Sequence, residues 1–148
     1  MPRTPKSSSP FWKLVNAGAR ANVAIYRASG GRFGAHIGKA PVLLLHHIGR
    51  KSGKARVAPV LYLDDGERLV VVASKGGTDK NPAWFHNLMG TPETDVEIGR
   101  ERRSVRARRA SDEERAALWP RLVEMYPQYA DYQRQADRTI PVIVLEPR

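Results

Sequence analysis

The chain has 148 residues, of which 41% are hydrophobic and none is cysteine. This length suits one domain with a core of its own, and the lack of cysteine excludes disulfides, iron–sulfur clusters and thiolate zinc sites. Lys and Arg outnumber Asp and Glu by 25 to 15, so the formal net charge is +10 and anionic partners are expected: phosphorylated cofactors, acidic membrane surfaces or nucleic acid.

The N-terminal region precedes the main pattern of strands. Residues 1–9 are rich in Ser, Pro and basic residues, which predicts a disordered tail, and residues 10–148 then form a single domain. Phe11–Tyr26 has the periodicity of an amphipathic helix, which either packs on the domain or lies on an anionic membrane with Phe11 and Trp12 inserted. No run approaches the roughly 20 apolar residues of a membrane span. We recognise no signal peptide and expect a cytoplasmic protein, at the inner face of the membrane if the helix inserts.

The middle of the chain is predicted to form hairpin-linked strands. Ser29–Lys39 is rich in glycine and is interpreted as a loop. Three strands follow, and Asp64-Asp65-Gly66 between the last two is short enough for an antiparallel hairpin. The predicted strands are Pro41–His47, Arg56–Leu63 and Arg68–Ala73.

The next predicted elements are a short helix and a second hairpin. Pro82–Met89 is expected to be helical, with Asn81 as the N-cap and Pro82 at the first helical position. Asp95–Ile98 and Glu101–Ala110 are expected to pair around a turn at Gly99-Arg100.

The C-terminal part is predicted to be helical, with one closing strand. Ser111-Asp112-Glu113-Glu114 is typical of a capping box that opens a helix to about Met125. A shorter helix follows Pro127, and Ile140–Leu145 is a β-branched strand. The tally is six strands with helices at the N-terminus, in the middle and near the C-terminus. Hairpins rather than long crossovers argue against a parallel sheet, so the predicted fold class is α+β, a small antiparallel barrel with appended helices.

The turn Gly49–Arg56 carries four cations within seven residues, around two glycines. It is not a Walker A loop, because only three residues separate the glycines and Ala55 follows the lysine. The cations could hold a phosphorylated ligand, or they could form an ordinary solvated turn.

A second basic cluster occupies the predicted strand 101–110. Strand alternation places Arg102, Arg106 and Arg108 on one face. A single-strand nucleic-acid binder would add aromatic side chains for base stacking, and this strand has none, so we favour a solvated or anion-facing surface. Adjacent His46 and His47 point to opposite faces of their strand and cannot chelate together, and we predict no metal site.

Two further segments are candidates for ligand binding. Ser74-Lys75-Gly76-Gly77 ends a buried strand, and its glycines would let a ligand approach the backbone; the alternative is a turn with a solvated lysine. Tyr126, Tyr129 and Tyr132 are spaced by three and would share one drifting helix face. They could pack in the core or line a pocket for a flat ligand.

Several motifs, taken together and in order, resemble the deazaflavin-dependent nitroreductase family, actinobacterial oxidoreductases with a split β-barrel fold. The match runs from roughly Pro41 to Pro147. The motifs are G-R-K-S-G-K-x-R (Gly49–Arg56), A-S-K-G-G (Ala73–Gly77), K-N-P-x-W-x-x-N (Lys80–Asn87), D-E-E-R (Asp112–Arg115), W-P-x-L-V-x-M-Y-P-x-Y-x-x-Y (Trp119–Tyr132) and D-R-x-I-P (Asp137–Pro141).

The resemblance implies a split β-barrel that binds coenzyme F420, a deazaflavin with an anionic phospholactyl-oligoglutamate tail. It also implies hydride transfer from reduced F420 to a quinone, a nitroaromatic compound or another small electrophile. The implied contacts to the phosphate and tail are Arg50, Lys51, Ser52 and Arg56, and those beside the deazaflavin ring are Ala73, Ser74, Lys75 and Gly76, with Trp84 and Asn87 nearby. The implied acceptor pocket is lined by Ser74, Tyr126, Tyr129 and Tyr132. Tyr126 is expected to orient or protonate the acceptor.

One departure from the family pattern lies in the pocket floor. His46-His47-Ile48 precedes Gly49 where small hydroxyl residues are expected. Two alternatives stay open on the sequence: the same barrel could bind FMN, or a basic barrel could bind nucleic acid. The physiological acceptor, the oligomeric state and the role of the run Arg100–Arg109 are also open.

Overall fold

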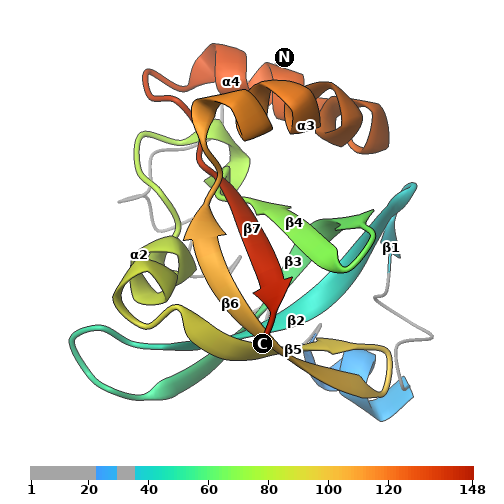
Figure 1. The fold of residues 1–148 in the computed structure, drawn as a ribbon, viewed down its shortest axis with the longest axis vertical. Helices are drawn as coiled ribbons and strands as arrows, with labels where there is room; N and C mark the ends of the chain where they lie inside the picture. The colour runs from blue at the N-terminus through green and yellow to red at the C-terminus, as the bar shows by residue number, and fades with distance from the viewer. Residues whose placement is uncertain (1–22, 30–35) are drawn as a thin grey trace.

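The computed structural model describes residues 23–29 and 36–148. Its strands form one antiparallel sheet in the order β1-β2-β3-β4-β7-β6-β5, and β2 also pairs with β5. The strands are β1 (His36–Ile37), β2 (Ala40–Ile48), β3 (Ala55–Asp65), β4 (Arg68–Val72), β5 (Glu93–Ile98), β6 (Glu101–Arg109) and β7 (Val142–Pro147). The β2–β5 pairing closes six strands into a barrel (Figure 1), so the predicted α+β barrel and both predicted hairpins are confirmed.

The strands β2, β4 and β7 are apolar on both faces because both faces are covered. Val71 and Ile143 pack in the cluster inside the barrel, whereas their neighbours Val70 and Val144 pack in a second cluster with residues of the C-terminal helices, such as Leu122. A strand that is buried on two sides has a continuous apolar run instead of an alternating one. This explains why the run 69–73 does not alternate.

The helices cover two sides of the barrel. They are α2 (Ala83–Gly90), α3 (Asp112–Met125) and α4 (Gln128–Gln135), together with the 3-10 turn η1 (Lys75–Gly77). In Figure 1, α3 and α4 lie together across the top of the barrel, and α2 lies at its left side. The predicted capping box is confirmed: Ser111 Oγ accepts from the Glu114 N–H at 3.2 Å, and Glu114 Oε1 accepts from the Ser111 N–H at 3.0 Å.

The predicted start of α2 is wrong by one residue. Pro82 is the N-cap and Ala83 is the first helical residue, and the Pro82 side chain makes no capping hydrogen bond. Asn81 is not available as a cap because its Oδ1 accepts a hydrogen bond from Arg138 Nη1. The predicted loop 29–39 also needs correction, because it contains the short strand β1, where His36 pairs with Pro41 of β2.

Residues 23–29 are helical and are attached to the barrel through Tyr26. The Tyr26 hydroxyl donates to Val42 O at 3.2 Å and accepts from the Gly99 N–H at 2.7 Å. Its neighbour Ile25 is 50% exposed. The predicted tail 1–9 and the predicted contacts of Phe11 and Trp12 fall outside the described residues. Within the described ranges, no helix is long and apolar enough to cross a membrane.

Candidate active site

The two basic clusters of the sequence differ in how their charges are balanced. Four of the five β6 arginines form ion pairs with carboxylates of the protein itself, and Arg108 has two such partners. These pairs are Arg102–Asp95 (2.8 Å), Arg103–Glu101 (2.9 Å), Arg106–Glu93 (3.5 Å), Arg108–Glu114 (2.7 Å) and Arg108–Glu146 (2.9 Å). Most of this cluster therefore ties β6 to its neighbours and to α3.

The cations of the turn between β2 and β3 differ from this cluster in having no carboxylate partner among the described residues. Across residues 23–29 and 36–148, none of the ion pairs includes Arg50, Lys51, Lys54 or Arg56, and all four are exposed. The turn is closed by its own backbone, since Gly49 N–H donates to Lys54 O at 2.9 Å and Gly53 N–H donates to Gly49 O at 2.7 Å. Four uncompensated positive charges on a tight turn make a site for an anion.

Helix α2 supports this turn through Asn87. The Asn87 side chain is 5% exposed, and its Oδ1 accepts from the Arg50 N–H at 3.0 Å. Its amide nitrogen bonds to Nδ1 of His47, also buried, at 2.9 Å. Burial first, and then the nearby Arg56 cation, lower the pKa of His47 to about 4. Burial first, and then Arg50, also lower the pKa of His86. Sequence reasoning had not assigned a ligand-binding role to His47 or His86.

The loop after β4 carries the predicted ring-binding residues and is held by one arginine. Lys75 has a φ of 42°, and burial lowers its pKa. Arg138 donates hydrogen bonds to five oxygens of the loop: Ala73 O (3.4 Å), Ser74 O (2.9 Å), Thr78 O (3.2 Å), Lys80 O (3.0 Å) and Asn81 Oδ1. Sequence reasoning missed this role, although Arg138 lies in the quoted D-R-x-I-P motif.

This loop lies directly against α4. Gly77 has a φ of +76°, and a Cβ placed on it would lie 2.6 Å from the carbonyl oxygen of Tyr132 and 2.8 Å from its Cα. Only glycine allows the two backbones to come this close. The structure thus brings the predicted ring-binding stretch next to the tyrosine helix, which follows about 50 residues later in the chain.

The three tyrosines do not have equal access to a ligand. Tyr126 and Tyr132 are partly buried, and both hydroxyls donate to Gln128 Oε1, at 2.7 and 3.0 Å. Tyr129 is 3% exposed and packs in the core between the barrel and α3, and burial raises its pKa. The prediction that all three phenols line one pocket therefore needs revision, because Tyr129 supports the other two from behind.

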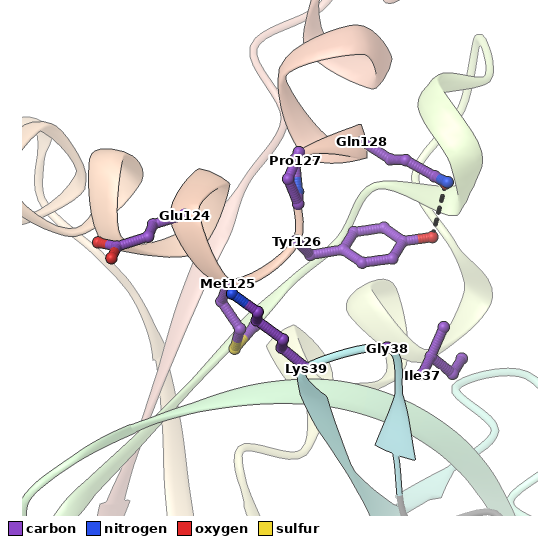
Figure 2. A pocket seen from close by; sticks show the side chains of 8 residues that line it. All are labelled: Ile37, Gly38, Lys39, Glu124, Met125, Tyr126, Pro127 and Gln128. Atoms are coloured by element: carbon purple, nitrogen blue, oxygen red, sulfur yellow. Dashed lines mark hydrogen bonds between the residues drawn. The ribbon is translucent and has the colours of Figure 1, made fainter.

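A cavity of about 420 Å³ opens beside Tyr126, between the β1–β2 turn and the α3–α4 junction. Figure 2 shows Ile37 and Lys39 on one side of it, with Tyr126 and Gln128 on the other. Its remaining lining residues are Gly38, Glu124, Met125 and Pro127. Most of the lining residues are exposed, so this is an open surface pocket in which Tyr126 and Met125 are the partly buried side chains.

Three further predicted residues lie in α2, directly after β4 and in the basic turn. Trp84, in the first turn of α2, packs partly buried against the barrel core. Ala73 is fully buried and donates its N–H to Pro141 O at 3.0 Å. Ser52 Oγ accepts from the Lys54 N–H at 3.2 Å inside the basic turn. In the part of the chain that the structure describes, no three His, Asp or Glu side chains are grouped to hold a metal ion.

The sequence profile of the F420H2-dependent quinone reductase family matches residues 18–147. The chain belongs to this family. A Mycobacterium tuberculosis relative is 50% identical over 118 residues, which cover 79% of this chain and 99% of the relative. An F420H2-dependent quinone reductase of the same species is 39% identical over 133 residues, covering 87% and 89%. The solved structure of an F420H2-dependent reductase is 39% identical with a TM-score of 0.66, covering 72% of this chain and 94% of that one.

Membership in the F420H2-dependent quinone reductase family makes the protein an oxidoreductase with coenzyme F420 as its cofactor. The resemblance seen in the motifs is therefore confirmed, and the FMN and nucleic-acid alternatives lose their support. The chemistry of the described residues fits this cofactor. An oligoanionic tail requires cations that are not already neutralised, and the β2–β3 turn provides four of them, whereas most of the β6 arginines are paired.

Proposed function

We propose that this quinone reductase binds F420 along a line from the β2–β3 turn to the loop after β4, and its hydride acceptor in the cavity beside Tyr126. Arg50, Lys51, Ser52 and Arg56 contact the phosphate and tail, and Ala73, Ser74, Lys75 and Gly76 lie beside the ring. When bound, reduced F420 supplies the hydride. The protein's own residues bind the cofactor, and they orient and protonate the acceptor.

The proposed F420 site is supported by the cations of the β2–β3 turn and by the ordered loop 73–81. The backbone of the turn that carries the cations is held without ligand by Asn87 and by the turn's own hydrogen bonds. Arg138 and the Gly77–Tyr132 contact likewise fix the loop 73–81 before a ligand arrives. A site that is already ordered loses less entropy on binding.

The proposed acceptor site is based on Tyr126, whose hydroxyl shares its hydrogen-bond acceptor with Tyr132. Tyr126 and Tyr132 both donate to the single oxygen Oε1 of Gln128. An acceptor oxygen in the adjoining cavity can replace Gln128 as the partner of Tyr126, while Tyr132 keeps Gln128 satisfied. Tyr126 can then orient a quinone carbonyl or a nitro group and deliver a proton to its oxygen after reduction.

The contrast between the two basic clusters is the observation that carries this proposal. A cation that is already paired with a carboxylate is less available to an anionic ligand than an unpaired cation. Here the cluster on β6 is mostly paired, and the cluster on the β2–β3 turn is outside every ion pair of the described residues.

Steady-state kinetics with reduced F420 and a quinone test the division of roles. Arg56→Ala should raise the KM for reduced F420 about 10- to 100-fold, the effect of losing one charge-assisted contact, with kcat within about twofold. Tyr126→Phe should lower kcat on the order of 10²-fold and leave that KM nearly unchanged. Arg102→Ala is the matched control, because Arg102 is paired with Asp95. Loss of cofactor binding in both site variants would refute the assignment.

We further propose that the N-terminal segment brings the enzyme to the membrane surface. Phe11 and Trp12 lie among basic residues in a predicted amphipathic helix, the composition of an interfacial anchor. Sedimentation with vesicles of anionic lipid should carry the wild type but leave Phe11→Ser/Trp12→Ser in the supernatant. Equal sedimentation of the two proteins would contradict the proposal.

A further inference from the structure

Asn87 determines which nitrogen of His47 carries the proton. The Arg50 N–H can only donate, so the Asn87 atom 3.0 Å from it is the oxygen Oδ1. The other amide atom, Nδ2, is a donor and lies 2.9 Å from His47 Nδ1. His47 Nδ1 therefore accepts, and the proton of the neutral ring resides on Nε2.

This Nε2–H is available to a ligand. It bonds to none of the described residues, and yet no fully buried side-chain nitrogen or oxygen in that part of the chain lacks a partner. Nε2 must therefore reach the surface of the molecule. His47 is only 6% exposed in total, so the accessible part of the ring is small and its orientation is fixed.

The exposed edge of His47 lies beside the proposed phosphate site. In the β2–β3 register, His47 is directly opposite Arg56, and residues that are paired across an antiparallel sheet point to the same face. The Arg56 guanidinium also lies at the turn, because a Cβ placed on Gly49 would be 3.5 Å from Arg56 Nε. An uncharged N–H donor and a guanidinium thus converge at the base of the basic turn.

We propose that His47 is a specificity-determining residue whose Nε2–H donates to an anionic oxygen of the F420 phosphate that Arg56 also contacts. This inference rests on the function proposed above. It assigns a role to the histidine that departs from the family's hydroxyl pattern. With a pKa of about 4, the ring is neutral near pH 7. Because Nδ1 accepts the hydrogen bond from Asn87, the neutral ring can donate only from Nε2.

The choice of variants separates binding from folding. His47→Asn keeps an acceptor close to the position of Nδ1, so the bond with Asn87 survives, but its side chain is too short to place a donor at Nε2. His47→Gln places an amide N–H near the position of Nε2. His46 provides the matched control, because this neighbour faces the other side of β2 and bonds to Glu97 Oε2 at 2.7 Å.

Fluorescence titration with F420, and with the deazaflavin chromophore that lacks phosphate and tail, tests the inference. We expect His47→Asn to weaken F420 binding about 10-fold and to change chromophore binding less than twofold. His47→Gln should recover part of the loss, and His46→Asn should change neither ligand. Wild-type affinity for F420 in His47→Asn, or equal losses for both ligands, would overturn the role of His47.

If His47→Asn does not fold, a second measurement still tests the inference. In the ¹⁵N-labelled wild type, the His47 Nε2–H resonance should shift on addition of F420 and stay in place on addition of the chromophore without tail. An unchanged resonance at saturating F420 would refute the contact. Failure of the wild type to bind F420 at all would instead refute the proposed function, so the two failures are distinguishable.

Discussion

The backbone of Gly77 lies against the backbone of Tyr132, so closely that a Cβ on Gly77 would be 2.6 Å from the Tyr132 carbonyl oxygen. This contact joins the loop proposed for the deazaflavin ring to the helix proposed for the acceptor. Ring and acceptor must be close for hydride transfer, and a rigid backbone contact keeps the two halves of the site at a constant distance.

The substitution Gly77→Ala should damage this arrangement, and Gly66→Ala provides its control. Both glycines have nearly the same φ, +76° and +74°, but a Cβ on Gly66 meets no atom within 4 Å. The left-handed backbone costs each variant about 1–2 kcal/mol. Gly77→Ala must also separate the loop from α4, so it should lose F420 affinity in a fluorescence titration while Gly66→Ala keeps it. Equal affinities in the two variants would contradict a role for the contact.

Removal of the Arg138 guanidinium should loosen the loop 73–81. Arg138→Lys keeps the charge, but an ammonium group has three donors and cannot reach five acceptors. We expect faster hydrogen exchange across residues 74–81 and an F420 affinity at least 10-fold weaker. Arg134→Lys is the control, since Arg134 is exposed and pairs with Asp131 on α4. Unchanged exchange in Arg138→Lys would show that the loop is held by other contacts.

The different positions of the tyrosines predict different effects of losing the hydroxyl. Tyr129→Phe should keep turnover within about twofold, because the Tyr129 ring is buried in the core and contributes packing. Tyr129→Ala should instead lower the free energy of unfolding by about 3–5 kcal/mol, as expected for a large-to-small change in a core. Chemical denaturation and steady-state turnover measure the two effects. A large loss of turnover in Tyr129→Phe would restore Tyr129 as an acceptor contact.

The buried imidazole of His47 should make stability depend on pH. Its pKa is about 4 in the folded protein against 6.5 for the free side chain, so the unfolded chain binds more protons between these values. Stability should rise from pH 4 to 6.5, by up to about 1.4 kcal/mol per pH unit, and then level off as far as this group is concerned. Thermal unfolding of the wild type and of His47→Asn, compared between pH 4 and 6.5, isolates the contribution of His47 to stability. His86, whose pKa is also lowered, acts in the same direction and stays present in both proteins.

Much of the fold could be predicted from local sequence patterns. Apolar runs, short turns and the Ser111–Glu114 capping box can be recognised from neighbouring residues in the sequence. The closure of the barrel could not be predicted this way, because it depends on pairing Leu44 with Glu97, which are 53 positions apart. Three of the β6 arginines show the same limit: the charges of Arg102, Arg106 and Arg108 are visible in the sequence, but their carboxylate partners come from β5, β7 and α3.

The candidate site was predictable as a set of motifs but not as an arrangement. The sequence identified the basic turn, the glycine loop and the tyrosines without showing that Gly77 contacts Tyr132. It also offered Asn81 as a helix cap, because local spacing does not reveal the competing bond from Arg138. The importance of His47 emerged only from the orientation of Asn87, which is fixed by a backbone N–H 37 residues away.

The crystal structure of the complex with F420 is the most direct test of the proposed site. We predict a phosphate oxygen within about 3 Å of the Arg56 guanidinium, with the rest of the tail along Arg50 and Lys51 and the deazaflavin ring against the backbone of residues 74–76. A tail held by the β6 arginines, or a ring that lies away from the loop after β4, would contradict the account.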